Sequence, residues 1–400
     1  MGYDLNRLVK TLGGLKSHTA IVTILLRRST KVWGALVLFS SQMLVSCRHT
    51  ENSPSGIEVL AGVDTLDLLF EVGEELGDSS NSFWSIASAD IDDLGRIFVL
   101  DDVEACVKVF DSTGAYIQNL TRRGSGPGEL LRPSYLNIAP DGRIVISDIT
   151  KGGFIVFNDS FELEDEVLLW GNNSPYCFAA LTKSKYLVCR YSETQLTDGY
   201  VLKHTADIYD FSSAENPINL YTDSIIENEH GSGLSYSREL VFVLFKGINS
   251  WCNDSGNVFI ATLDTLDYQV YGWDSLGNQF LFISLPISPV GKEPDEIDAE
   301  AFFMQTYYQR AGGWPPWEPS PYGHRFMTAE LGIGPDQNLW VRRGTRTDLF
   351  FDIFDLNGNL VRHAVYGLQS WSWKTVITTH GVLAWELDPL EGYQKLYFLR

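Results

Sequence analysis

A short turn followed at once by three apolar residues recurs along the chain. Asp93–Val99 is the clearest copy, with Asp, Gly and Arg in the turn and Ile-Phe-Val after it. Asp and Asn side chains bond to the amides of a turn, and Gly adopts positive φ angles that other residues resist. Each copy therefore predicts a tight connection between two β-strands. With Arg96, Arg143, Lys185, Asn257, Asn338 and Gly381 taken as equivalent, the spacings are 47, 42, 72, 81 and 43 residues.

A second marker follows the first in most copies. It is an aromatic residue, then Asp or Asn, usually with Gly three residues later. The full copies centre on Asp111, Asp274 and Asp355. Two tight turns divide each copy into four short strands, and four strands repeating at roughly 40–50 residues are typical of β-propeller blades. Six copies predict six blades, with the two long spacings as insertions.

The two ends of the chain complement each other. After the last turn, only Val382–Leu387 and Tyr393–Leu399 read as strands, so the sixth blade is one strand short. A strand-like segment, Thr65–Val72, precedes the first blade. Pairing this segment into the last blade closes the ring and leaves no blade to fray. The sequence therefore predicts an all-β, six-bladed β-propeller with four-stranded blades, closed by an N-terminal strand.

Residues 291–325 depart from the blade pattern. Acidic residues near Pro294 and a cation at Arg310 predict one short helix between them. A loop rich in Gly, Pro and Trp follows, and such a rigid aromatic loop loses little freedom on binding sugars or peptide rings. The alternative is that the helix and the tryptophans seal one face of the ring. The candidate ligand-binding residues of this insertion are Trp314, Trp317, Tyr322, His324 and Arg325.

A Gly-rich segment follows the first blade. Arg122 and Arg123 precede Gly124-Ser-Gly-Pro-Gly128, whose backbone amides could hold a phosphate or a carboxylate. The segment lacks the Lys-Ser/Thr pair of a P-loop and the helix that should follow. We favour a structural role as the crossover between two blades, and keep Arg122 and Arg123 as candidate ligand contacts.

The first 46 residues have the composition of a signal peptide. They hold six basic residues and one acidic residue, and an apolar stretch over 32–45 follows Arg27-Arg28 and Lys31. A positive region, an apolar stretch and small residues before a cut define a secretory signal. The stretch is shorter than the about 20 residues that a membrane-spanning helix needs. We expect a signal peptide over 1–46, with a translation start placed too far upstream accounting for residues 1–26.

Leu44-Val45-Ser46-Cys47 resembles the lipobox of bacterial lipoproteins. The resemblance implies cleavage before Cys47 and lipidation of its thiol, with several acyl chains holding the protein on a membrane. The alternative is a signal peptide followed by an unmodified Cys. The expected domains are a lipidated Cys and tether over 47–60 and a propeller over 61–400, in the cell envelope on the periplasmic side or at the surface.

Cysteines and metal motifs give few further sites. Cys177 and Cys189 flank 183–185 almost symmetrically, as cross-strand neighbours would, so they form either a disulfide or buried thiols. Asp90–Gly95 superficially resembles a calcium loop, but Leu94 occupies a ligand position and the twelfth place has no Glu. No CxxC, HExxH or GxSxG occurs. We predict no metal and no cofactor, and we name no catalytic residue.

The blade pattern, the linker Gly124–Glu129 and Asn338–Val341 resemble the six-bladed, NHL-like propeller lipoproteins of Gram-negative bacteria. The resemblance covers nearly the whole mature chain. It implies the propeller fold and a membrane anchor, but no single biochemical role, because propellers host binding modules and enzymes alike.

Charge and motif content narrow the function. With 30 Lys and Arg against 51 Asp and Glu, the net charge is −21, which argues against a sequence-independent nucleic-acid binder. We therefore predict a lipid-anchored binding or interaction module for a carbohydrate, a peptide or an envelope protein. The main alternative is a lactonase-like or lyase-like enzyme with a metal site in the central channel. A third is an envelope scaffold whose acidic rim docks a partner.

Overall fold

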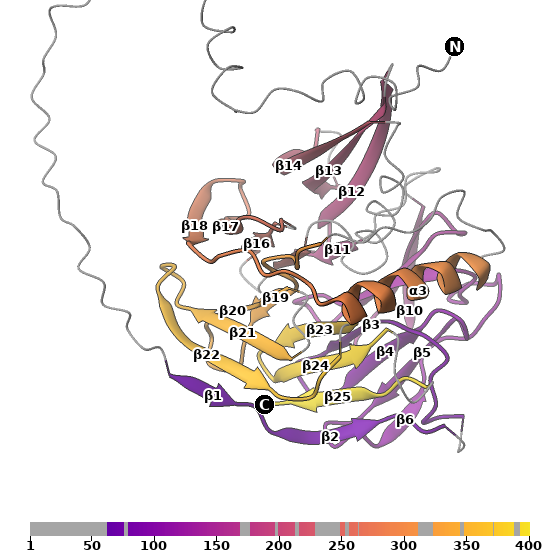
Figure 1. Ribbon diagram of the computed structural model, residues 1–400. Coiled ribbons are helices and arrows are strands. Elements are labelled where there is room, and N and C mark those ends of the chain that lie inside the picture. The colour runs from indigo at the N-terminus through magenta and orange to yellow at the C-terminus, as the bar shows by residue number, and fades with distance from the viewer. Residues whose placement is uncertain are drawn as a thin grey trace, which may run out of the picture. The chain divides into compact units, whose positions relative to one another are not determined.

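The chain folds into six β-sheets that follow one another in sequence (Figure 1). The computed structural model describes residues 62–75, 79–168, 177–196, 199–212, 216–228, 249–252, 256–262, 264–310, 323–344, 348–370, 372–387 and 393–400. Within each sheet, neighbouring strands are antiparallel and consecutive in the chain, except where the N-terminal segment joins. We number the sheets as blades 1 to 6 in the order in which they begin after residue 85.

Blades 1 to 3 contain twelve strands. Blade 1 has β3 (Ile86–Ile91), β4 (Ile97–Asp101), β5 (Cys106–Phe110) and β6 (Tyr116–Asn119). Blade 2 has β7 (Pro133–Ile138), β8 (Ile144–Asp148), β9 (Gly153–Phe157) and β10 (Leu163–Leu168). Blade 3 has β11 (Cys177–Ala180), β12 (Lys185–Leu196), β13 (Gly199–Asp210) and β14 (Ile218–Asn228).

Blades 4 to 6 contain the remaining strands. Blade 4 has β15 (Asn249–Cys252), β16 (Val258–Ala261), β17 (Tyr268–Trp273) and β18 (Gln279–Leu285). Blade 5 has β19 (Leu331–Ile333), β20 (Leu339–Arg342), β21 (Leu349–Phe354), β22 (Leu360–Tyr366) and, added at its edge, β1 (Val63–Thr65). Blade 6 has β23 (Trp373–Thr378), β24 (Gly381–Glu386), β25 (Leu396–Leu399) and β2 (Leu68–Val72).

The first strands of the blades form a closed inner ring. β3 contacts β7, β7 contacts β11, and the series continues through β15, β19 and β23 back to β3. The apolar triplets that mark the repeats lie in the second strands, where β4, β8, β16 and β20 are buried throughout. They pack between neighbouring blades as hydrophobic clusters. The six-bladed β-propeller predicted from the repeats is confirmed.

The tight turns have the predicted chemistry. Oδ1 of Asp274 accepts hydrogen bonds from the amides of Leu276 at 2.9 Å and Asn278 at 2.8 Å. Asp111 and Asp355 accept the same pair of bonds in their turns, and side chains and amides of these turns lower the pKa of all three carboxyls. The glycine that follows each has a φ of 84°, 84° or 87°. The repeated Asp and Gly are therefore required by the turn itself.

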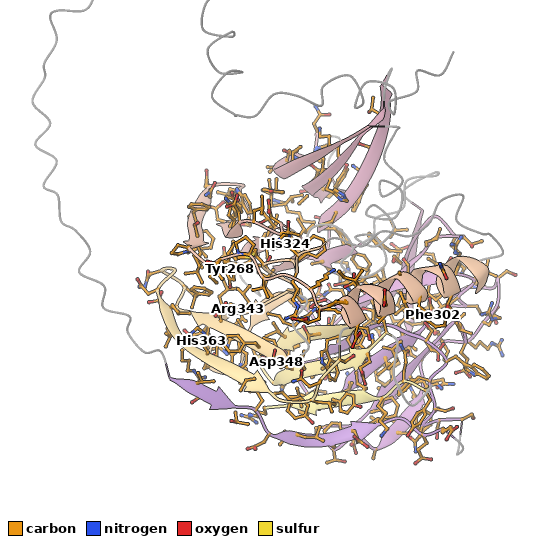
Figure 2. All side chains as sticks on the ribbon, viewed as in Figure 1. Tyr268, Phe302, His324, Arg343, Asp348 and His363 are labelled. Atoms are coloured by element: carbon orange, nitrogen blue, oxygen red, sulfur yellow. The ribbon has the colours of Figure 1, made fainter. Side chains whose placement is uncertain are left out.

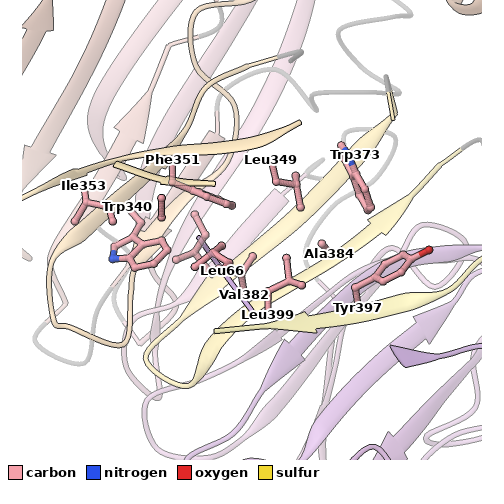
Figure 3. Packing of buried hydrophobic residues seen from close by; sticks show 12 residues of the cluster. Leu66, Trp340, Leu349, Phe351, Ile353, Trp373, Val382, Ala384, Tyr397 and Leu399 are labelled. Carbon is pink, nitrogen blue, oxygen red and sulfur yellow. The ribbon is translucent and has the colours of Figure 1, made fainter. Parts of the chain in front are cut away.

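The N-terminal segment closes the ring as predicted. β2 pairs antiparallel with β25, with Leu68 opposite Leu399 and Val72 opposite Leu396. Just before β2, Leu66 is 6% exposed and lies in the apolar cluster between blades 5 and 6 (Figure 3). The missing outer strand of the last blade thus comes from the beginning of the domain.

The sequence predicted one strand over residues 65–72, and the structure divides this segment between two blades. β1 pairs in parallel with β22, with Val63 opposite His363, whereas β2 belongs to blade 6. The break occurs at Leu66, whose amide donates to the carbonyl of Val365 while its side chain enters the core. The amide of Asp67 then donates to Arg400 of the last blade. Burial of Leu66 between the blades therefore splits the expected strand.

The predicted helix is α3 (Pro294–Arg310), within the connection from blade 4 to blade 5. Among the residues that the structure describes, no helix is long and apolar enough to cross a bilayer. The helix is stabilised at its start by acidic Asp295 and Glu296, as expected for the positive end of a helix dipole.

Candidate functional site: the long-connection face

The two ends of the strands differ in their connections. Strands alternate in direction, so the turns from first to second and from third to fourth strand share one face of the ring. The remaining connections, within and between blades, share the other face. The Asp/Gly turns that the structure describes lie on the first face, and α3 belongs to a connection on the second. We call the second face the long-connection face, and loops of this kind are where binding residues concentrate on rigid scaffolds.

A polar cluster lies where this face meets the inner ring. Glu330 directly precedes β19, and its Oε2 accepts a hydrogen bond from Nε of Arg342 at 2.6 Å. Lys374 of β23 places Nζ 3.4 Å from the other carboxylate oxygen of Glu330. The hydroxyl of Thr375 donates to Oε2 at 3.2 Å. The cluster therefore joins the inner strands of blades 5 and 6 through charged groups.

The charged side chains of this cluster are buried, which strengthens the attraction between Glu330 and its two cations. The side chains of Arg342, Lys374 and Glu330 are 2%, 9% and 16% exposed. Burial by itself raises the pKa of Glu330, but the charges of Arg342 and Lys374 outweigh it and hold that pKa below its ordinary value. Glu330 is therefore ionised at neutral pH, which suits ion pairing and ligand orientation better than proton donation.

Arg342 also ties the cluster to the backbone of the last blade. Its guanidinium donates to the carbonyl of Trp373 at 3.1 Å, next to Lys374. Equivalent positions in the other blades are occupied by Leu100, Ser147, Cys189, Ala261 and Trp385, as the strand registers show. An arginine at this one position is the sequence signal for the cluster, and it appears only after the repeats are aligned residue by residue.

Two buried ion pairs hold the helical insertion at its base. Nζ of Lys292 lies 2.7 Å from Oε2 of Glu300, with both side chains at most 2% exposed. Arg325 binds both carboxylate oxygens of Glu296 at 2.6 to 3.1 Å. Burial raises the pKa of Glu300, and the charge of Lys292 opposes that effect. The buried side of α3 is thus charged, while Phe302 on another side of the helix is 68% exposed.

The candidate residues of the insertion divide into described and undescribed ones. His324 is exposed and pairs by backbone with Gly291 at the base of the insertion, and Figure 2 labels it together with Phe302 on α3. Arg325 is engaged by Glu296, so its role in this structure is to hold the helix. Trp314, Trp317 and Tyr322 lie outside the described residues, so their ligand contacts stay predictions.

The Gly-rich segment already contains an anion from its own chain. Oε2 of Glu129 accepts a hydrogen bond from the amide of Gly126 at 2.8 Å, and Arg122 binds the other oxygen at 2.8 Å. The Gly126 amide and Arg122 lower the pKa of Glu129. A Cβ on Gly124 would lie 2.0 Å from the Glu129 carboxylate, so the loop is shaped around that group. Of the amides expected to hold a ligand anion, that of Gly126 donates to Glu129 and that of Gly128 donates to Glu166 at 2.8 Å, which supports the structural interpretation for Arg122.

Arg123 has a different environment from Arg122. Its guanidinium donates to the carbonyl of Val103 in the connection between β4 and β5, and the residue is exposed on the long-connection face. Arg123 therefore remains a candidate ligand contact.

Cys177 and Cys189 lie on neighbouring strands of blade 3. β11 and β12 place Cys177 directly opposite Cys189, so the expected cross-strand relation is confirmed. The disulfide itself stays a prediction, because the side chain of Cys177 is outside the described part of the structure. Cys47 and the expected signal peptide also lie outside the described residues.

A series of side-chain hydrogen bonds links the inner strands of blades 1, 2 and 3. Oδ2 of Asp90 accepts a hydrogen bond from the amide of Ile138 at 2.8 Å, and Oδ1 of Asn137 accepts one from the amide of Ala180 at 2.9 Å. Burial raises the pKa of Asp90 to about 6. Because these groups bond to the neighbouring strand at each step, they fasten blades 1, 2 and 3 together.

The structure also contains a polar cluster inside blade 5. Asp352 is fully buried and binds Arg343 through two bonds of 2.8 and 2.9 Å, while Nδ1 of His363 lies 2.8 Å from it. Arg343 and His363 are labelled on blade 5 in Figure 2. This cluster joins the third strand of the blade to its neighbours, away from the inner ring. Within the described ranges, no three His, Cys, Asp or Glu side chains converge in a way that would hold a metal ion.

Comparisons with known proteins agree with this architecture. The profile of the family DUF5128, described as a 6-bladed beta-propeller, matches residues 79–233. No curated protein matches the sequence.

Several solved structures are similar in fold. A member of the DUF4221 family from Bacteroides vulgatus has 8% identity and a TM-score of 0.49, covering 84% of this chain and 97% of its own. The calcium-binding protein regucalcin from Agrobacterium tumefaciens has 11% identity and a TM-score of 0.43, covering 84% and 95%. A catalytically inactive virginiamycin B lyase from Staphylococcus aureus has 9% identity and a TM-score of 0.44, covering 84% and 100%. Similarities at this level assign no activity, ligand or partner to this chain.

Proposed function

We propose that this protein is an exported, lipid-anchored propeller that binds a ligand or partner on its long-connection face. The observation that carries the proposal is the asymmetry between the faces. The Asp/Gly turns on one face satisfy their own amides, whereas the insertion and the Glu330–Arg342–Lys374 cluster belong to the other. Rigid sheets beneath variable connections are the usual arrangement of a binding scaffold.

The binding role predicts where a ligand protects the protein. A panel of short carboxylates, oligosaccharides and peptides would be screened by thermal shift on detergent-solubilised protein, because any ligand of the native state raises its apparent stability. Hydroxyl-radical footprinting with the best ligand should then protect segments such as 79–85, 101–105 and 323–330. The turns over 92–96, 274–278 and 355–359 serve as the internal control. Protection confined to those turns would show that we have assigned the wrong face.

The anchor predicts a change of cell fraction. Cys47→Ala removes the thiol that the lipobox resemblance marks for lipidation, so we expect the variant to move from the membrane fraction to the soluble fraction. Each acyl chain contributes about 0.8 kcal/mol per buried CH₂ to membrane binding. The variant lacks these chains, which are the proposed anchor. Cys106→Ala, at a buried cysteine of blade 1, is the matched control and should stay with the membrane. Equal membrane retention of Cys47→Ala and the parent would refute lipidation.

A further inference from the structure

The side chain of Trp84 is exposed to solvent, although its backbone is fixed by hydrogen bonds. It lies two residues before β3, on the long-connection face, and is 76% exposed. An indole is among the largest apolar groups a protein can bury, so an exposed one gives up a substantial stabilisation. The neighbouring Phe83 is 6% exposed and packs against blade 1. The chain therefore turns one aromatic residue inward and presents the next one to solvent.

The backbone beneath Trp84 is fixed by two buried charged residues. Asp101, which is fully buried, accepts a hydrogen bond from the amide of Trp84 at 2.7 Å. Lys108, 1% exposed, donates to the carbonyls of Ser79 at 2.8 Å and Ser82 at 2.6 Å. A side chain on such a backbone has little entropy to lose on binding, which is the advantage of a preorganised contact.

A cation binds the connection that Asp101 joins to the backbone of Trp84. Asp101 also accepts from the amide of Glu104 at 2.7 Å, so the connection between β4 and β5 is fastened next to Trp84. Val103 in that connection is 54% exposed, and its carbonyl accepts a hydrogen bond from Arg123. A guanidinium has five N–H donors, and this contact uses one of them. The surface thus combines an aromatic plane with donors suited to a carboxylate.

We propose that Trp84 and Arg123 bind a short saccharide that carries a carboxylate. A pyranose ring presents C–H groups on one face, which stack on the indole, and its carboxylate is placed to accept from Arg123. A protein partner would need a wider apolar centre than one Trp and one Val. The hydroxyl groups at the edge of a sugar ring are polar, so they can form hydrogen bonds with polar groups near the indole. The inference rests on the proposed binding role of the long-connection face.

The charge of the protein limits the size of this ligand. A net charge of −21 repels a long polyanion. Charges are screened beyond about 8 Å at physiological ionic strength, so a short acidic saccharide interacts mainly with the local Arg123. We therefore expect oligosaccharides rather than extended acidic polymers.

The test uses fluorescently labelled galacturonic acid trisaccharide and a neutral galactose trisaccharide, with binding measured by anisotropy on detergent-solubilised full-length protein. Trp84→Ala should weaken binding of both sugars at least about tenfold, as expected for loss of a stacking partner. Arg123→Gln should weaken the acidic sugar only. Phe302→Ala, which removes another exposed aromatic on the same face, is the matched control for Trp84, and Arg122→Gln is the control for Arg123.

Each outcome decides the proposal. Because Trp84 is exposed, Trp84→Ala should keep the unfolding temperature of the parent, so lost binding reports the contact itself. Failure of the parent to bind either sugar, or equal binding by Trp84→Ala, overturns the inference. Trp84-dependent binding of an acidic nonapeptide without sugar binding overturns it in favour of a peptide. If footprinting protects other segments of the long-connection face but not residues 79–85, the proposed binding role stands and the proposed site at Trp84 and Arg123 is wrong.

Discussion

Deleting residues 62–72 should make the protein aggregate at temperatures at which the parent stays folded. The deletion removes β2, so the buried strand β25 keeps β24 on one side and loses its outer partner along Leu396–Leu399. An unpaired strand edge with apolar side chains is a template for pairing with other chains. The deletion also removes Leu66 from the cluster between blades 5 and 6. Light scattering during heating, compared with the parent, measures the effect.

A single substitution tests the same closure without removing a strand. Leu66→Ala should lower the free energy of unfolding by about 2–5 kcal/mol, the range for truncating a buried leucine. Figure 3 shows why: Leu66 lies among Trp340, Val382 and Leu399 of two different blades. Leu69→Ala is the matched control, because Leu69 lies in β2 but is 51% exposed. We expect the control to change stability by less than about 0.5 kcal/mol.

Chemical denaturation of the two variants gives the comparison directly. If Leu66→Ala and Leu69→Ala unfold at the same denaturant concentration, the N-terminal segment does not stabilise the ring in the way that its packing indicates. A deletion variant that melts at the temperature of the parent would contradict the closure itself.

The number of blades was predictable because the tight turns between strands recur along the sequence with the same residues. The turns at Asp111, Asp274 and Asp355 use the same side-chain bonds and the same glycine conformation, so the sequence repeats whatever the geometry repeats. The closing strand was predictable by elimination, since the last blade lacked one. The division of this strand at Leu66 was not predictable, because a single leucine that packs between two blades produces no periodic pattern in the sequence.

The candidate site was much less predictable. Glu330, Arg342 and Lys374 come from three separate strands or strand ends, and they meet only because β19 contacts β23 in the ring. The Gly-rich and Trp-rich segments stand out locally in the sequence, and they were the predicted sites. One of these, around Gly124 and Gly126, is shaped around its own Glu129. Local composition identifies loops, whereas an inner-ring site depends on which residues the closure brings together.

Glu330→Gln should cost about 3–5 kcal/mol of stability at neutral pH, the range for breaking a buried ion pair from one side. The substitution keeps the shape of the side chain but leaves Arg342 and Lys374 buried without their anion. Glu71→Gln is the matched control, because Glu71 lies 3.3 Å from Lys395 but is 44% exposed. An exposed pair of this kind contributes less than about 1 kcal/mol.

The pH dependence separates loss of charge from loss of packing. The pKa of Glu330 is lowered in the folded protein, so its ionised form contributes stability that is fully present above the unfolded-state pKa. That contribution is lost as the pH falls through the folded-state pKa, where Glu330 becomes neutral like the glutamine. The difference between the parent and Glu330→Gln should therefore be largest at pH 7 and shrink on acidification, in denaturant titrations at each pH. A difference that stays constant into the acid range would mean that the variant disturbs packing, and that the charge of Glu330 is not what joins blades 5 and 6.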